Sequence, residues 1–144
     1  MTPTPPAFRE ANLIKWSDEI HALGIRKIDD QHKQLVGLIN ALDARRGSGD
    51  AKFITDVFAT LIHYIKKHFA DEERLLKRMS YRKFEDHHAQ HARFSAALES
   101  FRQMFEKEGP SPELVLRLTK WLGEWLQQHI LVEDKAYARD LFEE

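Results

Sequence analysis

Apolar residues recur every three or four positions along most of the chain, which is the period of an amphipathic α-helix. The pattern predicts long helices over residues 29–45, 51–79 and 83–108, and a fourth that starts at Ser111-Pro112. Short breaks rich in Gly, Ser and Pro separate them, at residues 47–50, 80–82 and 109–110. Four amphipathic helices with short connections predict an all-α fold, an antiparallel up-down-up-down four-helix bundle.

The two ends of the chain do not follow this pattern. Pro3, Pro5 and Pro6 oppose regular structure at the start, so residues 1–28 are predicted to form an irregular N-terminal arm. Its apolar side chains are expected to lie over the core: Trp16, Ile20, Leu23 and Ile25. Residues 29–133 then make the bundle, and residues 134–144 a C-terminal tail with a short helix. Together, residues 1–144 have the size of one domain.

Composition narrows the classes of function. The 22 basic and 23 acidic residues leave a net charge of -1, so nucleic acid and anionic membranes are not expected partners. The chain has no Cys, which excludes thiolate metal sites and cysteine nucleophiles. No run of about 18 apolar residues or secretory leader occurs, so we expect a cytoplasmic protein without membrane insertion.

Polar residues occupy core positions in all four predicted helices. A single His on an apolar face is usually a hydrogen-bonded core residue. Six polar core residues need a common explanation, because each unsatisfied buried polar group costs about 1–3 kcal/mol. In an antiparallel bundle, their distances from the connecting turns place them in one layer. They are His32, His68, Glu72, His87, His91 and His129.

The spacing of these residues is that of metal ligands in a bundle core. His68 and Glu72, like His87 and His91, are four residues apart and therefore share a helix face. Asp134 lies five residues after His129, and joins the layer only if the helix ends there or widens into a π-turn. Five imidazoles and two carboxylates are too many for one tetrahedral ion, and suit two ions that share carboxylates. Nitrogen-rich ligation favours iron, zinc or copper over magnesium or calcium.

The full set of ligand spacings resembles the seven-ligand signature of the hemerythrin family. The phrases GIRKIDDQHKQLVGLIN, HFADEE and WLQQHILVEDKAY resemble its bacterial branch, the bacteriohemerythrins, and the likeness extends over residues 16–137. The resemblance implies a non-haem centre with two iron ions. It assigns one iron to His87, His91 and His129, and the other to His32 and His68. Glu72 and Asp134 would bridge the irons together with an oxo or hydroxo group.

The resemblance also implies reversible dioxygen binding, for oxygen storage, delivery or sensing, rather than an enzyme. An oxygen-consuming enzyme is a conceivable partner. A dry pocket for dioxygen is expected from neighbours of the ligands: Leu35, Phe69, Trp125, Leu126 and Ile130. One alternative is a di-iron enzyme with peroxidase, oxidase or nitric oxide reductase activity, and another is iron storage or buffering. Ferritin-like oxygen-activating sites use Glu-x-x-His on each of two helices, a pair that this sequence lacks.

Several nearby residues are predicted to play no direct part in metal binding. His21, His63 and His88 are expected at the surface or in structural roles beside the ligands. Asp71 and Glu73 point about 100° to either side of Glu72 and are expected to be exposed. The family often has Met, Gly and Pro at the positions of Leu76, Ser80 and Arg82 in this chain. Small shifts are therefore expected in the turn between the second and third helices.

Overall fold

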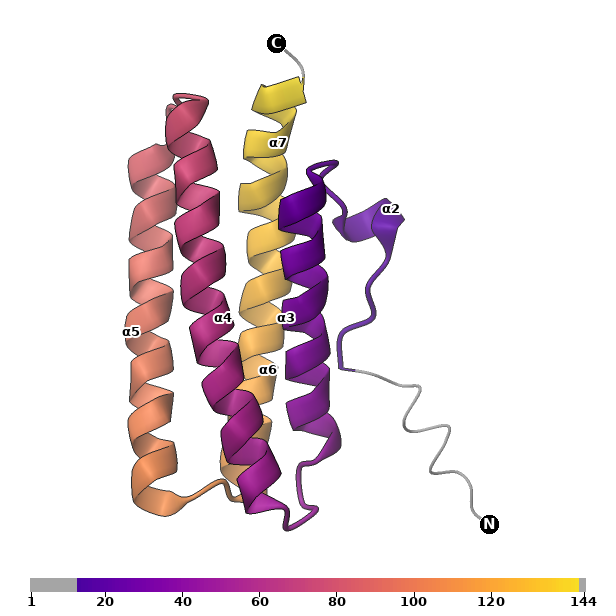
Figure 1. The fold of residues 1–144 in the computed structure, drawn as a ribbon, viewed down its shortest axis with the longest axis vertical. Helices are drawn as coiled ribbons and strands as arrows, with labels where there is room; N and C mark the ends of the chain where they lie inside the picture. The colour runs from indigo at the N-terminus through magenta and orange to yellow at the C-terminus, as the bar shows by residue number, and fades with distance from the viewer. Residues whose placement is uncertain (1–12, 143–144) are drawn as a thin grey trace.

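The computed structural model describes residues 13–142, and every regular element in that range is helical. The elements are α2 (Asp18–His21), α3 (Arg26–Ala44), α4 (Ala51–Arg78), α5 (Phe84–Glu108), α6 (Pro112–Gln128), the π-helix η1 (His129–Asp134) and α7 (Lys135–Phe142). Figure 1 shows the long helices side by side and alternating in direction. The predicted all-α, up-down-up-down bundle is therefore confirmed. None of the helices in this range is long and apolar enough to span a membrane.

Two of the long helices start at a side-chain cap. The Asp50 carboxylate accepts a hydrogen bond from the Phe53 amide at 3.2 Å, at the start of α4. The Ser111 hydroxyl accepts one from the Leu114 amide at the same distance, and Pro112 follows as the first residue of α6. Each cap satisfies an amide that the helix itself leaves without an acceptor. These local signals explain why the predicted starts of both helices are correct.

The end of α4 is a Schellman motif, with Ser80 in the left-handed position. The Tyr81 amide donates to the Leu76 carbonyl at 3.0 Å, and the Ser80 amide to the Lys77 carbonyl at 3.1 Å. Ser80 has φ of 52° and is the one non-glycine residue with positive φ in the described range. This conformation favours glycine because a Cβ atom is strained there. The turn therefore forms with a serine in the position that favours glycine.

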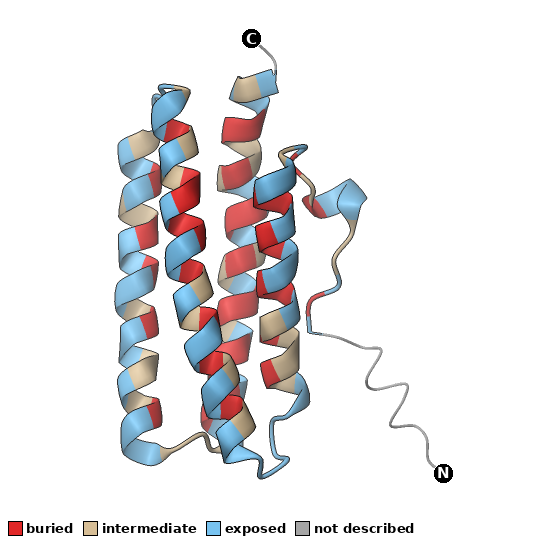
Figure 2. Ribbon diagram, in the orientation of Figure 1, coloured by how far each residue is buried: buried red, intermediate tan, exposed pale blue. Residues whose placement is uncertain are grey.

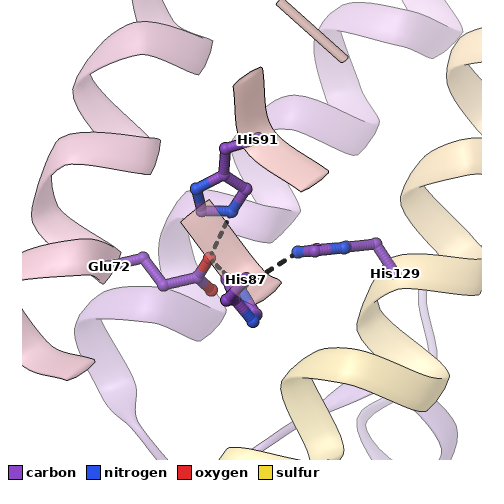
Figure 3. Close-up of side chains that lie close together, drawn as sticks. All are labelled: Glu72, His87, His91 and His129. Carbon is purple, nitrogen blue, oxygen red and sulfur yellow. Dashed lines mark hydrogen bonds and ion pairs between the residues drawn. The ribbon is translucent and has the colours of Figure 1, made fainter. Parts of the chain in front are cut away.

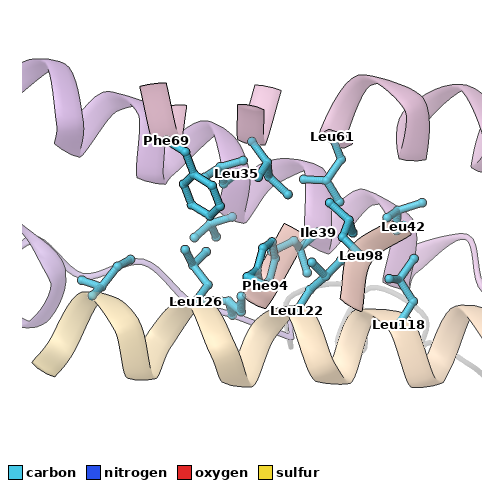
Figure 4. Packing of buried hydrophobic residues seen from close by; sticks show 14 of the residues in the cluster. Leu35, Ile39, Leu42, Leu61, Phe69, Phe94, Leu98, Leu118, Leu122 and Leu126 are labelled. Carbon is cyan, nitrogen blue, oxygen red and sulfur yellow. The ribbon is translucent and has the colours of Figure 1, made fainter. Parts of the chain in front are cut away.

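Apolar side chains from the four long helices fill the interior. Figure 2 shows buried residues along the inward side of each helix, and Figure 4 shows how Leu35, Phe69 and Leu126 meet Phe94 across the core. Phe94 also stacks on Trp121, with ring centroids 4.7 Å apart, which joins α5 to α6. This packing fixes the rotation of each helix and so decides which polar side chains face inward.

The arm from residue 13 to residue 25 is held against α3 and α6. The Asn40 amide pairs with both backbone groups of Ile14, at 3.0 Å to its nitrogen and 2.8 Å to its oxygen. A Cβ atom on Gly123 would lie 3.4 Å from Ile14 Cδ1, so glycine permits this close approach. Leu23 is buried as expected, but Ile20 is 52% exposed, and the prediction that it covers the core is wrong.

The boundaries of the arm and the tail differ from the predicted ones. The first bundle helix begins at Arg26 rather than at residue 29. At the other end, α6, η1 and α7 follow one another without a break, so the last helix continues past residue 133. The predicted short C-terminal helix is present as α7. The prolines predicted to make the start irregular, Pro3, Pro5 and Pro6, lie outside the described residues, as do residues 143–144.

Candidate metal centre

Seven polar side chains meet in one layer of the bundle, and each is at least 97% buried. They come from three long helices and from the π-helix that follows α6: His32 from α3, His68 and Glu72 from α4, His87 and His91 from α5, and His129 and Asp134 from η1. These are the seven residues singled out from the sequence. Imidazole nitrogens and carboxylate oxygens from six of them, all except Asp134, form two groups, each compact enough to hold one metal ion. The groups are Glu72 with His87, His91 and His129, and Glu72 with His32 and His68.

Glu72 lies between the two groups, with one carboxylate oxygen toward each. Its Oε1 is 3.0 Å from Nε2 of His87 and 3.0 Å from Nε2 of His91. Its Oε2 is 3.9 Å from Nε2 of His68. Figure 3 shows the carboxylate pointing at the rings of His87 and His91, with His129 on the far side. One oxygen on each side is the arrangement that a bridging carboxylate requires.

Asp134 has the same two-sided arrangement. Its Oδ1 is 3.1 Å from Nε2 of His129 and 3.3 Å from Nε2 of His87, while its Oδ2 is 3.2 Å from Nε2 of His32. Asp134 reaches this position because the helix is a π-helix from His129 to Asp134. The widened turn anticipated from the five-residue spacing is therefore present.

Several of these atoms lack a hydrogen-bonding partner. Among the described residues, the buried side-chain nitrogens and oxygens without one are both ring nitrogens of His32, Nε2 of His91 and both oxygens of Asp134. Except for Nδ1 of His32, these atoms lie 3.0–3.3 Å from other polar atoms of the layer. Such burial costs about 1–3 kcal/mol for each atom unless a ligand satisfies it. Lone pairs that converge on common points, from imidazoles and carboxylates, fit transition-metal ions.

The charges of the layer compensate one another. Burial alone would lower the pKa of His87, but the facing carboxylates of Asp134 and Glu72 raise it to about 10. Burial would likewise raise the pKa of Asp134, yet the facing His129, His32 and His87 hold it well below its ordinary value. Burial lowers the pKa of His68 to about 4, so its ring is neutral at neutral pH. A neutral imidazole and ionised carboxylates are the forms that bind metals.

Hydrogen bonds from neighbouring residues orient the ligands, and the sequence analysis missed these neighbours. Tyr137 Oη donates to Glu72 Oε2 at 2.6 Å. Nδ1 of His91 lies 2.7 Å from Glu73 Oε2, and Nδ1 of His68 lies 2.7 Å from Gln31 Oε1. All three are next to a ligand in the chain or one turn from one. Their closeness in the sequence to His32 and Asp134 could have identified Gln31 and Tyr137 as neighbours of the ligands.

Three expectations for the surroundings were wrong or incomplete. Asp71 is buried rather than exposed, because it accepts hydrogen bonds from Gln31, Lys67 and Arg74. Glu73 is only partly exposed, with its two oxygens facing His91 and His88. His21 is buried in the arm, where its ring contacts Gln127 and the Ser17 amide. His63 and His88 are exposed, as expected.

An apolar cavity of about 20 Å³ adjoins the layer, where His32, His68 and His129 line it. That volume suffices for one small molecule. Four residues of the predicted dioxygen pocket line it: Leu35, Phe69, Trp125 and Leu126. Ile130 is buried but is not among the residues that line this cavity. The other apolar lining residues, which were not predicted, are Ile39, Leu61, Ile65, Phe94 and Leu122.

Known proteins share this sequence pattern and this fold. The family described as "Hemerythrin HHE cation binding domain" matches residues 23–141. A bacteriohemerythrin of Stenotrophomonas maltophilia is 31% identical over 127 residues, which cover 88% of this chain and 80% of that protein. A bacteriohemerythrin of Pseudomonas aeruginosa PAO1 is 33% identical over 129 residues, which cover 89% of this chain and 80% of that protein.

Solved structures agree with these relatives. A crystal structure of wild-type hemerythrin superposes with a TM-score of 0.79 at 25% identity, over 88% of this chain and 95% of that one. An L114A mutant of hemerythrin gives 0.80 at 24% identity, with the same coverage. The fold, the buried His and carboxylate layer and the match over residues 23–141 lead to one conclusion: this chain belongs to the hemerythrin family.

Proposed function

We propose that this protein binds dioxygen reversibly at a non-haem di-iron centre, for oxygen storage, delivery or sensing. The observation that carries the proposal is the small apolar cavity beside His32 and His68. That side of the layer has two imidazoles, whereas the other side has three. The cavity is lined by both imidazoles of the first side and by His129 alone of the other, and we place a small molecule in it at the metal ion that has fewer protein ligands.

The seven buried residues would hold the irons. His87, His91 and His129 would bind one ion, and His32 and His68 the other. Glu72 and Asp134, each with an oxygen toward either side, would bridge the two together with an oxo or hydroxo group. Bound iron would supply the reversible interaction with dioxygen, which no protein side chain provides.

The cavity contributes selectivity. Its volume of about 20 Å³ and its mainly apolar lining suit a diatomic molecule and exclude a larger organic substrate. Excluding water from the lining also protects an oxygen adduct from exchange with solvent. Both properties favour binding over turnover of a bulky substrate, and this is why we place dioxygen binding ahead of an oxygenase or oxidase.

The test uses the iron-loaded, reduced protein under argon, then air, then argon again. We expect an iron content of two per chain, and a visible charge-transfer absorption that appears in air and disappears in argon. Resonance Raman spectra with the two oxygen isotopes would identify the vibrations of the bound oxygen. Full iron loading without a reversible change would overturn the proposal, and uptake of further iron would favour storage.

Two neighbouring histidines provide a matched pair for this experiment. His87→Ala should abolish the oxygen-dependent absorption, because His87 faces both carboxylates. His88→Ala should preserve it, because the His88 side chain is 55% exposed and its ring faces Glu73, which is not one of the seven residues of the layer. The reverse result would contradict the assignment of the ligands.

A further inference from the structure

Two imidazoles of the layer have a hydrogen-bonding partner at Nδ1, and the two partners differ in chemistry. Nδ1 of His91 lies 2.7 Å from a carboxylate oxygen of Glu73, whereas Nδ1 of His68 lies 2.7 Å from the amide oxygen of Gln31. One imidazole on the three-imidazole side of the layer therefore has a carboxylate partner, whereas one on the two-imidazole side has an amide partner. A carboxylate partner makes an imidazole a more basic ligand than an amide partner does.

Gln31 has a second contact, with Asp71. Its Nε2 lies 2.7 Å from Asp71 Oδ2, and both residues are buried. An ionised carboxylate only accepts hydrogen bonds, so the amide NH₂ must face Asp71 and the amide oxygen must face His68. Nδ1 of His68 must then be the donor. Its Nε2 is left with a lone pair, directed into the layer toward Glu72.

Three basic side chains keep Asp71 an acceptor. Lys67 Nζ lies 3.0 Å and Lys27 Nζ lies 3.6 Å from Asp71 Oδ2, and Arg74 donates to Oδ1. The Asp71 side chain is only 3% exposed, while the three cations are mostly in solvent. A continuous path of contacts thus runs from the surface cations through Asp71 and Gln31 to His68.

We propose that Gln31, oriented by Asp71, is a positioning residue that fixes His68 in the Nδ1–H tautomer and so sets the metal affinity of the two-imidazole side. The inference rests on the proposed function in taking His68 as a metal ligand. It adds that the hydrogen bonds of this path have a fixed direction: His68 donates to Gln31, and Gln31 donates to Asp71. This direction, rather than packing alone, leaves the Nε2 lone pair of His68 available. Gln31 itself would contact neither the metal ion nor dioxygen.

The direct test is nitrogen-15 NMR of histidine-labelled, metal-free protein, which distinguishes the two ring tautomers. We expect His68 to be the Nδ1–H form in the unaltered protein and in Gln31→Glu, which keeps an acceptor. Gln31→Met removes the acceptor with little change in length, and should populate the Nε2–H form. Gln34→Met on the exposed side of the same helix is the control and should change nothing. An Nε2–H form in the unaltered protein, or an unchanged tautomer in Gln31→Met, would overturn the inference.

A second readout is titration with Zn²⁺ alone. Loss of an oriented hydrogen-bond partner weakens metal binding about 10- to 100-fold, so Gln31→Met should weaken one binding event by that factor and spare the other. Equal weakening of both events, or of neither, would contradict the inference.

These readouts separate the inference from the proposed function. A protein that binds dioxygen but has Nε2–H His68 would overturn this inference alone. One with Nδ1–H His68 that binds iron but never dioxygen would overturn the proposed function alone.

Discussion

His129 and Asp134 are five residues apart, yet Nε2 of His129 lies 3.1 Å from Oδ1 of Asp134. In a regular α-helix, at about 100° per residue, their side chains would point about 140° apart. The π-helix from His129 to Asp134 removes this conflict, because its hydrogen bonds join residues five apart and bring both to one face. A local change of helix geometry thus completes the layer.

The length of η1 should therefore control metal binding. Inserting one alanine after Val132 should turn Asp134 away from the layer and reduce the number of Zn²⁺ ions bound, measured by calorimetric titration. Deleting Val132, which is exposed, is the control. It should retain binding as an α-helix with a four-residue spacing, like that of His68 and Glu72. Equal effects of the insertion and the deletion would refute this explanation of η1.

The hydroxyl of Tyr137 should contribute to stability. It is fully buried and donates to Glu72 Oε2 at 2.6 Å. Because hydrogen bonds to charged groups contribute about 1.5–3 kcal/mol, Tyr137→Phe should lower the free energy of unfolding of the metal-free protein by that amount. Urea denaturation would measure it. Tyr64→Phe, on a half-buried position of α4, should change it by less than about 0.5 kcal/mol. A similar loss in both variants would contradict the role of the Glu72 contact.

Ser80 offers the opposite test, a gain in stability. Its φ of 52° is strained for a residue with a Cβ atom. Ser80→Gly should raise the free energy of unfolding by about 1 kcal/mol, since glycine adopts this conformation without strain. Ser95→Gly, at an exposed position inside α5, should lower it by about 0.5–1 kcal/mol. Thermal denaturation of both variants would show whether the signs are opposite, and loss of stability in Ser80→Gly would be the contrary result.

Filling the cavity should separate metal binding from oxygen binding. Ile65 lines the cavity and is not one of the polar residues of the layer, so Ile65→Phe should occupy much of its roughly 20 Å³. We expect normal iron content, a weaker oxygen-dependent absorption, and a stability loss of about 1–3 kcal/mol from overpacking. Ile62→Phe, on a half-buried position outside the cavity, should leave the absorption unchanged. Unaltered oxygen binding in Ile65→Phe would place the oxygen site elsewhere.

Much of the fold follows from local sequence. The three- and four-residue period assigned the long helices, and the caps at Asp50 and Ser111 fixed two of their starts. The same period placed His87 and His91 on the buried face of α5 and His88 outside it. This succeeds because an α-helix fixes the relative directions of its own side chains, whatever surrounds it.

The helical period failed where a side chain depends on a neighbouring helix. Asp71 and Glu73 flank Glu72, and their helical directions alone suggested exposure. Asp71 is buried because Gln31 of α3 and three cations surround it. Ile20 was expected over the core, but it lies in α2, where His21 rather than Ile20 is buried.

By itself, then, the sequence determined the helices, the seven polar residues of the layer and the need for a wider turn before Asp134. Only the tertiary structure decided which oxygen of Glu72 and of Asp134 faces which imidazole. It also decided that Gln31 rather than a carboxylate meets His68, and that Ile130 does not line the cavity. The physical reason is that contacts between helices depend on their mutual rotation and spacing, which the packing of the whole core sets.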